Sequence, residues 1–90
     1  MTYSRKRKQK DELFAILSHS YRREVLSALH ERESRPSTLE ELSQHIATVH
    51  ENAHIEQVKL SLHHVHLPKL REFGVIEYDE QSKTIRYHAS

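Results

Sequence analysis

Apolar residues recur at helical spacing along most of the chain and give way to β-branched and aromatic residues near its end. Four segments show the helical spacing and are predicted to be helices, namely residues 11–17, 21–32, 38–49 and 55–73. Residues 75–78 and 84–88 are predicted to be strands, joined into a hairpin by the polar loop 79–83. We therefore expect an α+β fold that is mostly helical.

Capping and helix-breaking residues mark the ends of these segments. Ser20 is a suitable N-cap for the second helix, and Pro36 marks the break that follows this helix. Thr38 and Glu41 have the spacing of a capping box at the start of the third helix, in which each side chain bonds to the backbone N–H of the other. Gly74 is expected to end the fourth helix in the left-handed conformation.

The apolar stripes identify the side chains expected in the core. On the third and fourth helices these are Leu39, Leu42, Ile46 and Val49, and Ile55, Val58, Leu62 and Val65. The aromatic side chains expected in the core are Phe14, Tyr21 and Phe73. The hairpin should turn Ile85, and either Val75 or Ile76, towards the helices. Tyr78 and Tyr87 are interpreted as a cross-strand pair.

Pro68 lies inside the fourth predicted helix. A proline removes one helical hydrogen bond, and its ring clashes with the carbonyl group four residues earlier, which here belongs to His64. We therefore expect a kink or a local break between His64 and Pro68. His66 lies within this break and is expected to pack or to cap inside the domain.

The composition limits the classes of function. The chain has 90 residues, of which 36% are hydrophobic and 30% are charged, so a single small domain with a thin core is expected. The absence of Cys excludes disulfides, thiolate metal sites and cysteine nucleophiles. The sequence contains no glycine-rich phosphate loop, nucleophile elbow or H-E-x-x-H motif, so neither catalysis nor a cofactor is predicted. With a charged N-terminus and no long apolar run, a cytoplasmic protein without a membrane segment is expected.

Positive charge is concentrated at the N-terminus. Residues 1–10 contain five basic side chains and no acid, whereas residues 11–90 carry 9 basic and 13 acidic side chains, a net charge of −4. The five basic residues are Arg5, Lys6, Arg7, Lys8 and Lys10. We interpret residues 1–10 as a flexible basic arm that contacts DNA or only aids solubility, and residues 11–90 as the folded domain. Arg22 and Arg23 either contact phosphates or pair with acids such as Glu24.

Several motifs together resemble a known family. They are Leu13–Ser18 (LFAILS), Tyr21–Leu26 (YRREVL), Leu39–Leu42 (LEEL), Leu62–Leu70 (LHHVHLPKL) and Gly74–Asp79 (GVIEYD). Their order and spacing resemble the archaeal, haloarchaeal-type winged helix-turn-helix domains, which are similar to ArsR-type transcriptional regulators. The resemblance implies a three-helix core with an extra N-terminal helix and a C-terminal hairpin wing.

The resemblance also implies a function and a set of site residues. The expected function is sequence-specific binding of double-stranded DNA by a small transcription regulator of an archaeon or an archaeal virus. A homodimer is expected, because one small module buries too little surface for strong specificity. Residues 56–66 would form the recognition helix in the major groove, while the hairpin and the basic arm would contact the backbone. The DNA-binding residues so expected are Gln57, Lys59, Ser61, His63 and His64 in the helix, Lys83 and Arg86 in the wing, and the five basic residues of the arm.

Two other interpretations remain open. Winged helices also serve as protein-interaction modules in transcription or replication assemblies, and the acidic body of the chain suits that role. Two histidine pairs have helical spacings that can place two imidazoles on one face, namely His50 with His54 and His63 with His66. Because no motif supplies the remaining ligands, no metal site is predicted.

Since the chain stops at Ser90, a dimer is expected to use the N-terminal helices or the wing.

Overall fold

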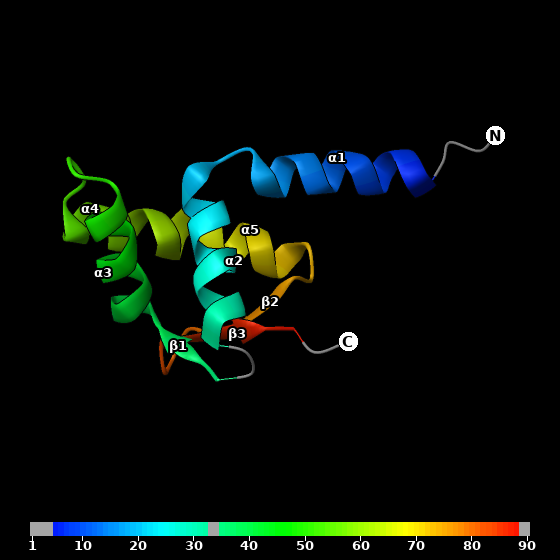
Figure 1. Cartoon of the computed structure of the whole chain (residues 1–90). Coiled ribbons are helices and arrows are strands. Elements are labelled where there is room, and N and C mark those ends of the chain that lie inside the picture. Colours follow the sequence, from blue (N-terminus) through cyan, green and yellow to red (C-terminus); the bar gives the residue numbers. More distant parts are fainter. Residues whose placement is uncertain (1–4, 33–34, 89–90) are drawn as a thin grey trace.

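The computed structural model describes residues 5–32 and 35–88, with side chains described from Asp11 onward. Its elements in chain order are α1 (Arg5–Leu17), α2 (Ser20–Arg32), β1 (Ser37–Thr38), α3 (Leu39–Val49), α4 (Ile55–Ser61), the π-helical turn η1 (Leu62–His66), α5 (Leu67–Glu72), β2 (Ile76–Asp79) and β3 (Thr84–Tyr87). The expected α+β, mostly helical fold is confirmed (Figure 1). No helix in these residues is both long and apolar enough to cross a bilayer.

The helices α2 to α5 enclose the core, and a small sheet closes it on one side (Figure 1). The core residues with almost no exposed surface are Val25, Leu29, Leu42, Ile46, Val58, Leu62, Leu67, Leu70, Ile76 and Ile85. Burial of these aliphatic side chains is the main driving force for folding in a domain of this size. Ile76 and Ile85 are the inward residues of the hairpin, as expected.

The sheet has three antiparallel strands in the order β1-β3-β2. The hairpin of β2 and β3 is confirmed, but β1 was not predicted because it is only two residues long. In the hairpin register Tyr78 lies opposite Ile85 and Tyr87 lies opposite Ile76, so the expected Tyr78–Tyr87 pair is wrong. The hydroxyl group of Tyr87 instead donates to the carbonyl oxygen of Leu26, at 2.6 Å, and ties the last strand to α2.

The structure confirms the capping box predicted at the start of α3 and the left-handed glycine predicted after α5. The Thr38 hydroxyl accepts from the Glu41 N–H at 3.0 Å, and the Glu41 carboxylate accepts from the Thr38 N–H at 2.9 Å. Gly74 has φ 77°, the left-handed conformation that only glycine adopts at little cost. Ser20 is not the cap of α2 but its first residue, and His19 accepts the free N–H groups of the first turn through its ring and its carbonyl group.

A π-helical turn solves the problem that Pro68 creates. In this turn the N–H of Leu67 donates to the carbonyl oxygen of Leu62, five residues earlier, so the chain passes Pro68 without a full break. The wider turn moves the inward-facing position by one residue. His66 is therefore only 3% exposed, while Val65 is 52% exposed. The expectation that Val65 faces the core is wrong for this reason, and the expectation that His66 packs inside the domain is confirmed.

Helix α1 begins earlier than expected and projects from the rest of the molecule (Figure 1). It already begins at Arg5 rather than near Asp11, so the second half of the expected flexible arm is helical, while residues 1–4 lie outside the described residues. Among its described side chains, from Asp11 to Leu17, only that of Ile16 is buried. Phe14 is 74% exposed, so its expected place in the core is wrong, because little of the domain lies beside α1. Val49 is also exposed, since it is the last residue of α3.

Candidate nucleic-acid interface

Helix α4 and the turn between β2 and β3 border the same shallow hollow, with a volume of about 200 Å³. Its lining residues are Leu39, Glu56, Lys59, Leu60, His63 and Lys83. The structure therefore brings together three of the predicted site residues, Lys59 and His63 from the helical segment and Lys83 from the hairpin. Leu60 was not among the predicted site residues, although it is the exposed apolar residue of this group.

The hairpin turn is held in place by backbone and carboxylate hydrogen bonds. The carbonyl oxygen of Lys83 accepts from the N–H of Leu39 at 2.9 Å, which fixes the turn against the start of α3. The carboxylate of Asp79 accepts from the N–H groups of Gln81 at 3.0 Å and Ser82 at 3.4 Å. These bonds stabilise the ionised form and lower the pKa of Asp79 below its usual range. Lys83 itself has φ 58°, so the turn presents this side chain from a left-handed residue.

Arg71 on α5 fastens the hairpin from the other side. Its guanidinium donates to the carboxylate of Glu80 at 2.9 Å and to the carbonyl oxygen of Tyr78 at 3.3 Å, and lies 5.7 Å from the centre of the Tyr78 ring. The hydrogen bond from Arg71 lowers the pKa of Glu80. Burial raises the pKa of Tyr78. Arg71 and Glu80 neutralise each other, so neither adds net charge to this face.

The ammonium group of Lys59 forms ion pairs with two carboxylates. Its Nζ atom lies 2.6 Å from the carboxylate of Glu40 on α3 and 3.6 Å from that of Glu56, one turn earlier. The hydrogen bond to Glu40 raises the pKa of Lys59 above its usual value. A phosphate group would therefore have to compete with two carboxylates for this ammonium group.

The two histidines expected to face a DNA groove have different environments. His63 is half-buried, and its Nδ1 atom lies 2.7 Å from the hydroxyl oxygen of Tyr78 on β2. His64 is exposed, with its ring centre 4.9 Å from that of His63. His64 is thus accessible to a partner, whereas His63 connects the helical segment to the β2–β3 hairpin.

The remaining predicted site residues are spread over three elements. Gln57 on α4 and Arg86 on β3 are exposed, and Ser61 is half-buried. The five basic residues of the expected arm occupy the first turns of α1, and their side chains lie outside the description. Figure 1 shows this end of α1 far from α4 and from the hairpin turn, so one chain does not bring the two groups together.

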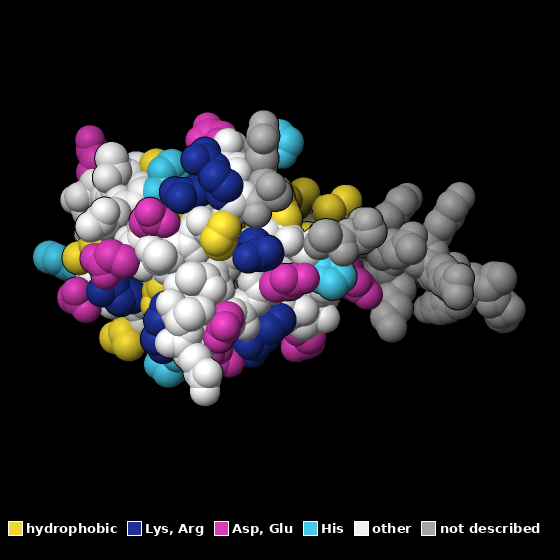
Figure 2. Space-filling model, turned by 90° about the horizontal axis from the view of Figure 1, so that it is seen from below, with side chains coloured by type: hydrophobic (Ala, Val, Ile, Leu, Met, Phe, Trp, Pro, Cys, Tyr) yellow, Lys and Arg dark blue, Asp and Glu magenta, His cyan; other side chains and the backbone are white. Residues whose placement is uncertain are grey.

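Charges of both signs alternate over the face on which the sheet lies. Figure 2 shows Lys and Arg side chains interspersed with Asp and Glu side chains on this face. This mixture agrees with the net charge of −4 for residues 11–90. A broad positive patch of the kind that dominates non-specific DNA binding is therefore not formed by the described side chains of this face.

Arg22 and Arg23 serve a role that the sequence did not suggest. Arg22 is buried and donates to the carbonyl oxygens of Ile16 at 3.2 Å and Ala15 at 2.6 Å. Arg23 donates to the carbonyl oxygen of Leu17 at 2.5 Å. Both arginines thus bind the free carbonyl groups at the end of α1. The expected phosphate contact stays a prediction for Arg23, whose side chain is exposed.

The histidine pairs do not extend into a metal centre in the described part of the chain. No group of three or more His, Asp or Glu side chains is placed there to hold a metal ion. His66 is turned away from His63 towards Arg22, because the π-helical turn directs it into the domain.

Comparison with known protein families matches residues 14–86 to a domain of unknown function, DUF7344. Comparisons with curated proteins and with solved structures give no significant match. The matched segment runs from the second half of α1 to β3 and covers well over half of the chain. The chain therefore belongs to the DUF7344 family.

Proposed function

We propose that the chain is a winged helix-turn-helix protein that binds double-stranded DNA sequence-specifically, as a small archaeal or archaeal-virus transcription regulator in the cytoplasm. The order α2, β1, α3, α4 to α5, β2, β3 supports this assignment, as does the pairing of β1 with β3 beside the hairpin. In this assignment α4 and η1 form the recognition helix, and the β2–β3 hairpin forms the wing.

The observation that carries the proposal is the shared hollow between α4 and the wing turn. The major groove of DNA is about 12 Å wide and admits one α-helix. A helix in the groove with a hairpin beside it contacts bases and the adjacent backbone at the same time. Gln57 and His64 are exposed on the helical side, and Lys83 and Arg86 are exposed on the wing side. These four side chains are the proposed contacts to bases and phosphates.

The proposal places most of the electrostatic attraction outside the acidic body. Lys59 is paired with Glu40 and Glu56, so Lys83 and Arg86 are the main cations of this face. The five basic residues at the start of α1 would supply the larger part of the attraction. Each phosphate contact adds about −0.9 to the slope of log K against log salt. Binding should therefore weaken steeply as salt is added.

The DNA-binding form is proposed to be a homodimer that uses α1. Leu13, Phe14 and Leu17 are 55%, 74% and 41% exposed, and together they form the α1 ridge. An isolated helix of this length is marginal in water unless its apolar side is covered. Pairing of two α1 ridges would cover both and would bring two recognition helices into one assembly. Two such helices read two half-sites, and a single module buries little surface for strong specificity.

The test is DNA binding of the full chain, measured by fluorescence anisotropy with a random-sequence duplex over a series of salt concentrations. Lys83→Ala should weaken binding and reduce the salt slope by about 1, because one phosphate contact is lost. Lys69→Ala, on the exposed side of α5, is the matched control and should leave both unchanged. If the full chain fails to bind at low salt, the alternative role as a protein-interaction module, which the α1 ridge also fits, replaces DNA binding.

A further inference from the structure

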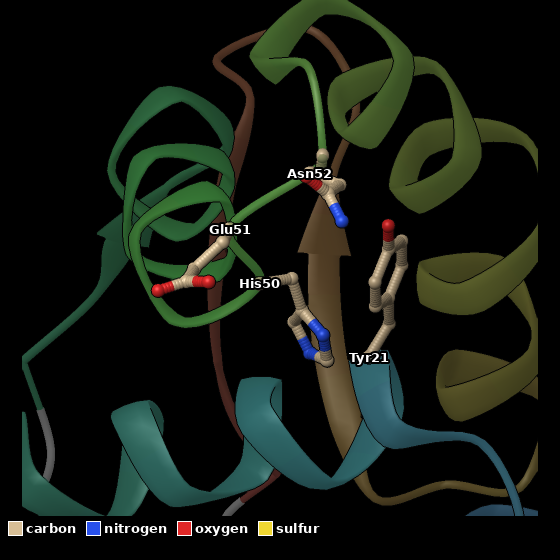
Figure 3. A pocket seen from close by; sticks show the side chains of 5 residues that line it. Tyr21, His50, Glu51 and Asn52 are labelled. Carbon is tan, nitrogen blue, oxygen red and sulfur yellow. The ribbon is translucent and has the colours of Figure 1, made fainter.

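Four aromatic rings meet where α1 joins α2. The ring centres of His19 and His66 lie 4.2 Å apart, and that of Tyr21 lies 5.1 Å from His19 and 5.6 Å from His66. The ring centre of His50, which follows the end of α3, lies 5.3 Å from that of Tyr21, and Figure 3 shows these two rings beside each other. Three imidazoles from three different parts of the chain therefore pack against one phenol ring.

In the hydrogen bond between Arg22 and His66, the guanidinium is the donor and the imidazole is the acceptor. Nη1 of Arg22 lies 3.0 Å from Nδ1 of His66, and both side chains are buried. A guanidinium has only N–H donors, so Nδ1 of His66 must accept and the imidazole must be neutral. The same guanidinium holds the carbonyl oxygens of Ala15 and Ile16. His66 is thereby linked through Arg22 to the end of α1.

His19 is subject to the same requirement. Its Nδ1 atom lies 3.1 Å from the backbone nitrogen of Tyr21, which can only donate. The imidazole of His19 is therefore neutral as well, and it stands next to that of His66. Addition of a proton to either Nδ1 atom would place two donors against each other.

The charged groups around these two imidazoles all disfavour a further positive charge. His66 on η1 faces Arg22 from α2 and His19 from the junction, and burial is the largest of the causes that lower its pKa to about 4. His19 is acted on by Arg22, Arg23 and His50, and burial is again the largest cause of its lowered pKa. The cluster is thus stable as long as its imidazoles stay neutral.

We propose that the Arg22–His66 contact is a proton-operated latch that fixes α1 on the domain. A proton on Nδ1 of His66 removes the acceptor and repels the Arg22 guanidinium. Arg22 then loses its buried position, and the carbonyl groups of Ala15 and Ile16 lose their donor. Acid therefore frees α1, with its ridge and its basic first turns, to change direction. The latch rests on these contacts alone and does not depend on DNA binding.

The test measures the position of α1 in the full chain. Because the chain contains no Cys, Asp11→Cys and Glu72→Cys allow two spin labels to be attached at exposed sites on α1 and α5. Labelled protein is diluted with unlabelled protein, and the distance between the labels is measured by pulsed electron spin resonance from pH 7.5 to pH 4. A single narrow distance distribution is expected at pH 7.5, and it should broaden or shift as the pH falls.

His66→Gln separates the latch from a general effect of acid. The glutamine oxygen can accept from Arg22 at every pH, so the distribution should stay narrow over the whole range. His64→Gln changes an exposed neighbour and should respond to acid like the wild type. The proposal is overturned if His66→Gln responds to acid as the wild type does.

A measurement on the chain without a substitution at His66 covers the case in which His66→Gln does not fold. Nitrogen NMR of the imidazoles should show an unprotonated Nδ1 on His66 at pH 7.5. The change in label distance should follow the titration of this nitrogen. An unchanged distance while His66 takes up its proton would refute the latch.

Discussion

The Nδ1 atom of His63 lies 2.7 Å from the hydroxyl oxygen of Tyr78, and this contact joins the π-helical turn to the second strand. The same strand is held from α5 by Arg71. The direction in which the β2–β3 hairpin points is therefore set by side chains of the helical segment that precedes it. In a DNA-binding winged helix, such contacts would fix the recognition helix and the wing relative to each other.

Tyr78→Phe should lower the free energy of unfolding by about 1 kcal/mol, because one partly buried hydrogen bond is lost while the ring is kept. Tyr21→Phe is the matched control, since the Tyr21 hydroxyl forms no hydrogen bond within residues 11–32 and 35–88. Urea unfolding followed by circular dichroism measures both values. Equal stability of Tyr78→Phe and the wild type would show that the contact contributes nothing.

Gly74→Ala should destabilise the domain by about 1 kcal/mol. No atom lies within 4 Å of the position that a Cβ would take, so the cost comes from the backbone at φ 77° and not from a clash. Gly74→Asn should cost less, because asparagine tolerates the left-handed region better than alanine. The urea midpoints of the wild type and the two variants give the order of their stabilities. A Gly74→Ala variant as stable as Gly74→Asn would contradict the explanation by backbone conformation.

The free energy of unfolding should decrease as the pH is lowered from about 6.5 to 4. His66 has a pKa of about 4 in the folded chain and an ordinary value of 6.5, so the unfolded chain binds the proton first as the pH falls. The stabilisation is complete above pH 6.5 and is lost on the way to pH 4, by up to about 3 kcal/mol.

The urea midpoint of the wild type at pH 7, 5.5 and 4.5 measures this loss. His66→Gln should show a flatter dependence on pH, because glutamine does not titrate, whereas His64→Gln should keep the slope of the wild type. If the slope for His66→Gln matches that of the wild type, other groups cause the loss.

Phe14→Ser should shift the proposed dimer towards the monomer with little change in the stability of the fold. The Phe14 side chain is 74% exposed, so it contributes little to packing within one chain, and in the proposed dimer it would pack between chains. Leu60→Ser removes another exposed apolar side chain, outside the α1 ridge, and serves as control. Sedimentation velocity over a range of concentrations gives the association constants. A wild type that is monomeric at high micromolar concentration would rule out the proposed dimer.

The sequence predicted those parts of the fold that depend on neighbouring residues. The capping box of Thr38 and Glu41, the left-handed Gly74 and the two strands all follow from local backbone chemistry. The π-helical turn did not follow, because Pro68 permits a kink, a break or a wider turn, and packing selects among them. The exposure of Phe14 did not follow either, because an apolar stripe along a helix does not show whether the rest of the domain lies beside it.

For the candidate site, sequence reasoning identified residue types on a helix and a wing but not their partners. Lys59 was expected to contact DNA, but its ammonium group is bound by Glu40 of another helix. His63 was expected to face a groove, yet Tyr78 binds it. Arg22 and His66 are 44 positions apart, and their contact forms only after the π-helical turn directs His66 inward. Such partners are brought together by the tertiary fold, which periodicity does not encode.

The most direct test of DNA binding is an NMR titration of the isotope-labelled full chain with a short random-sequence DNA duplex at low salt. We predict shifts of the amide signals that are largest in residues 55–66 and 80–86, the helical segment and the wing, and that reverse when salt is added. Shifts confined to α1, or a spectrum that the duplex leaves unchanged, would contradict the proposal that this face binds DNA.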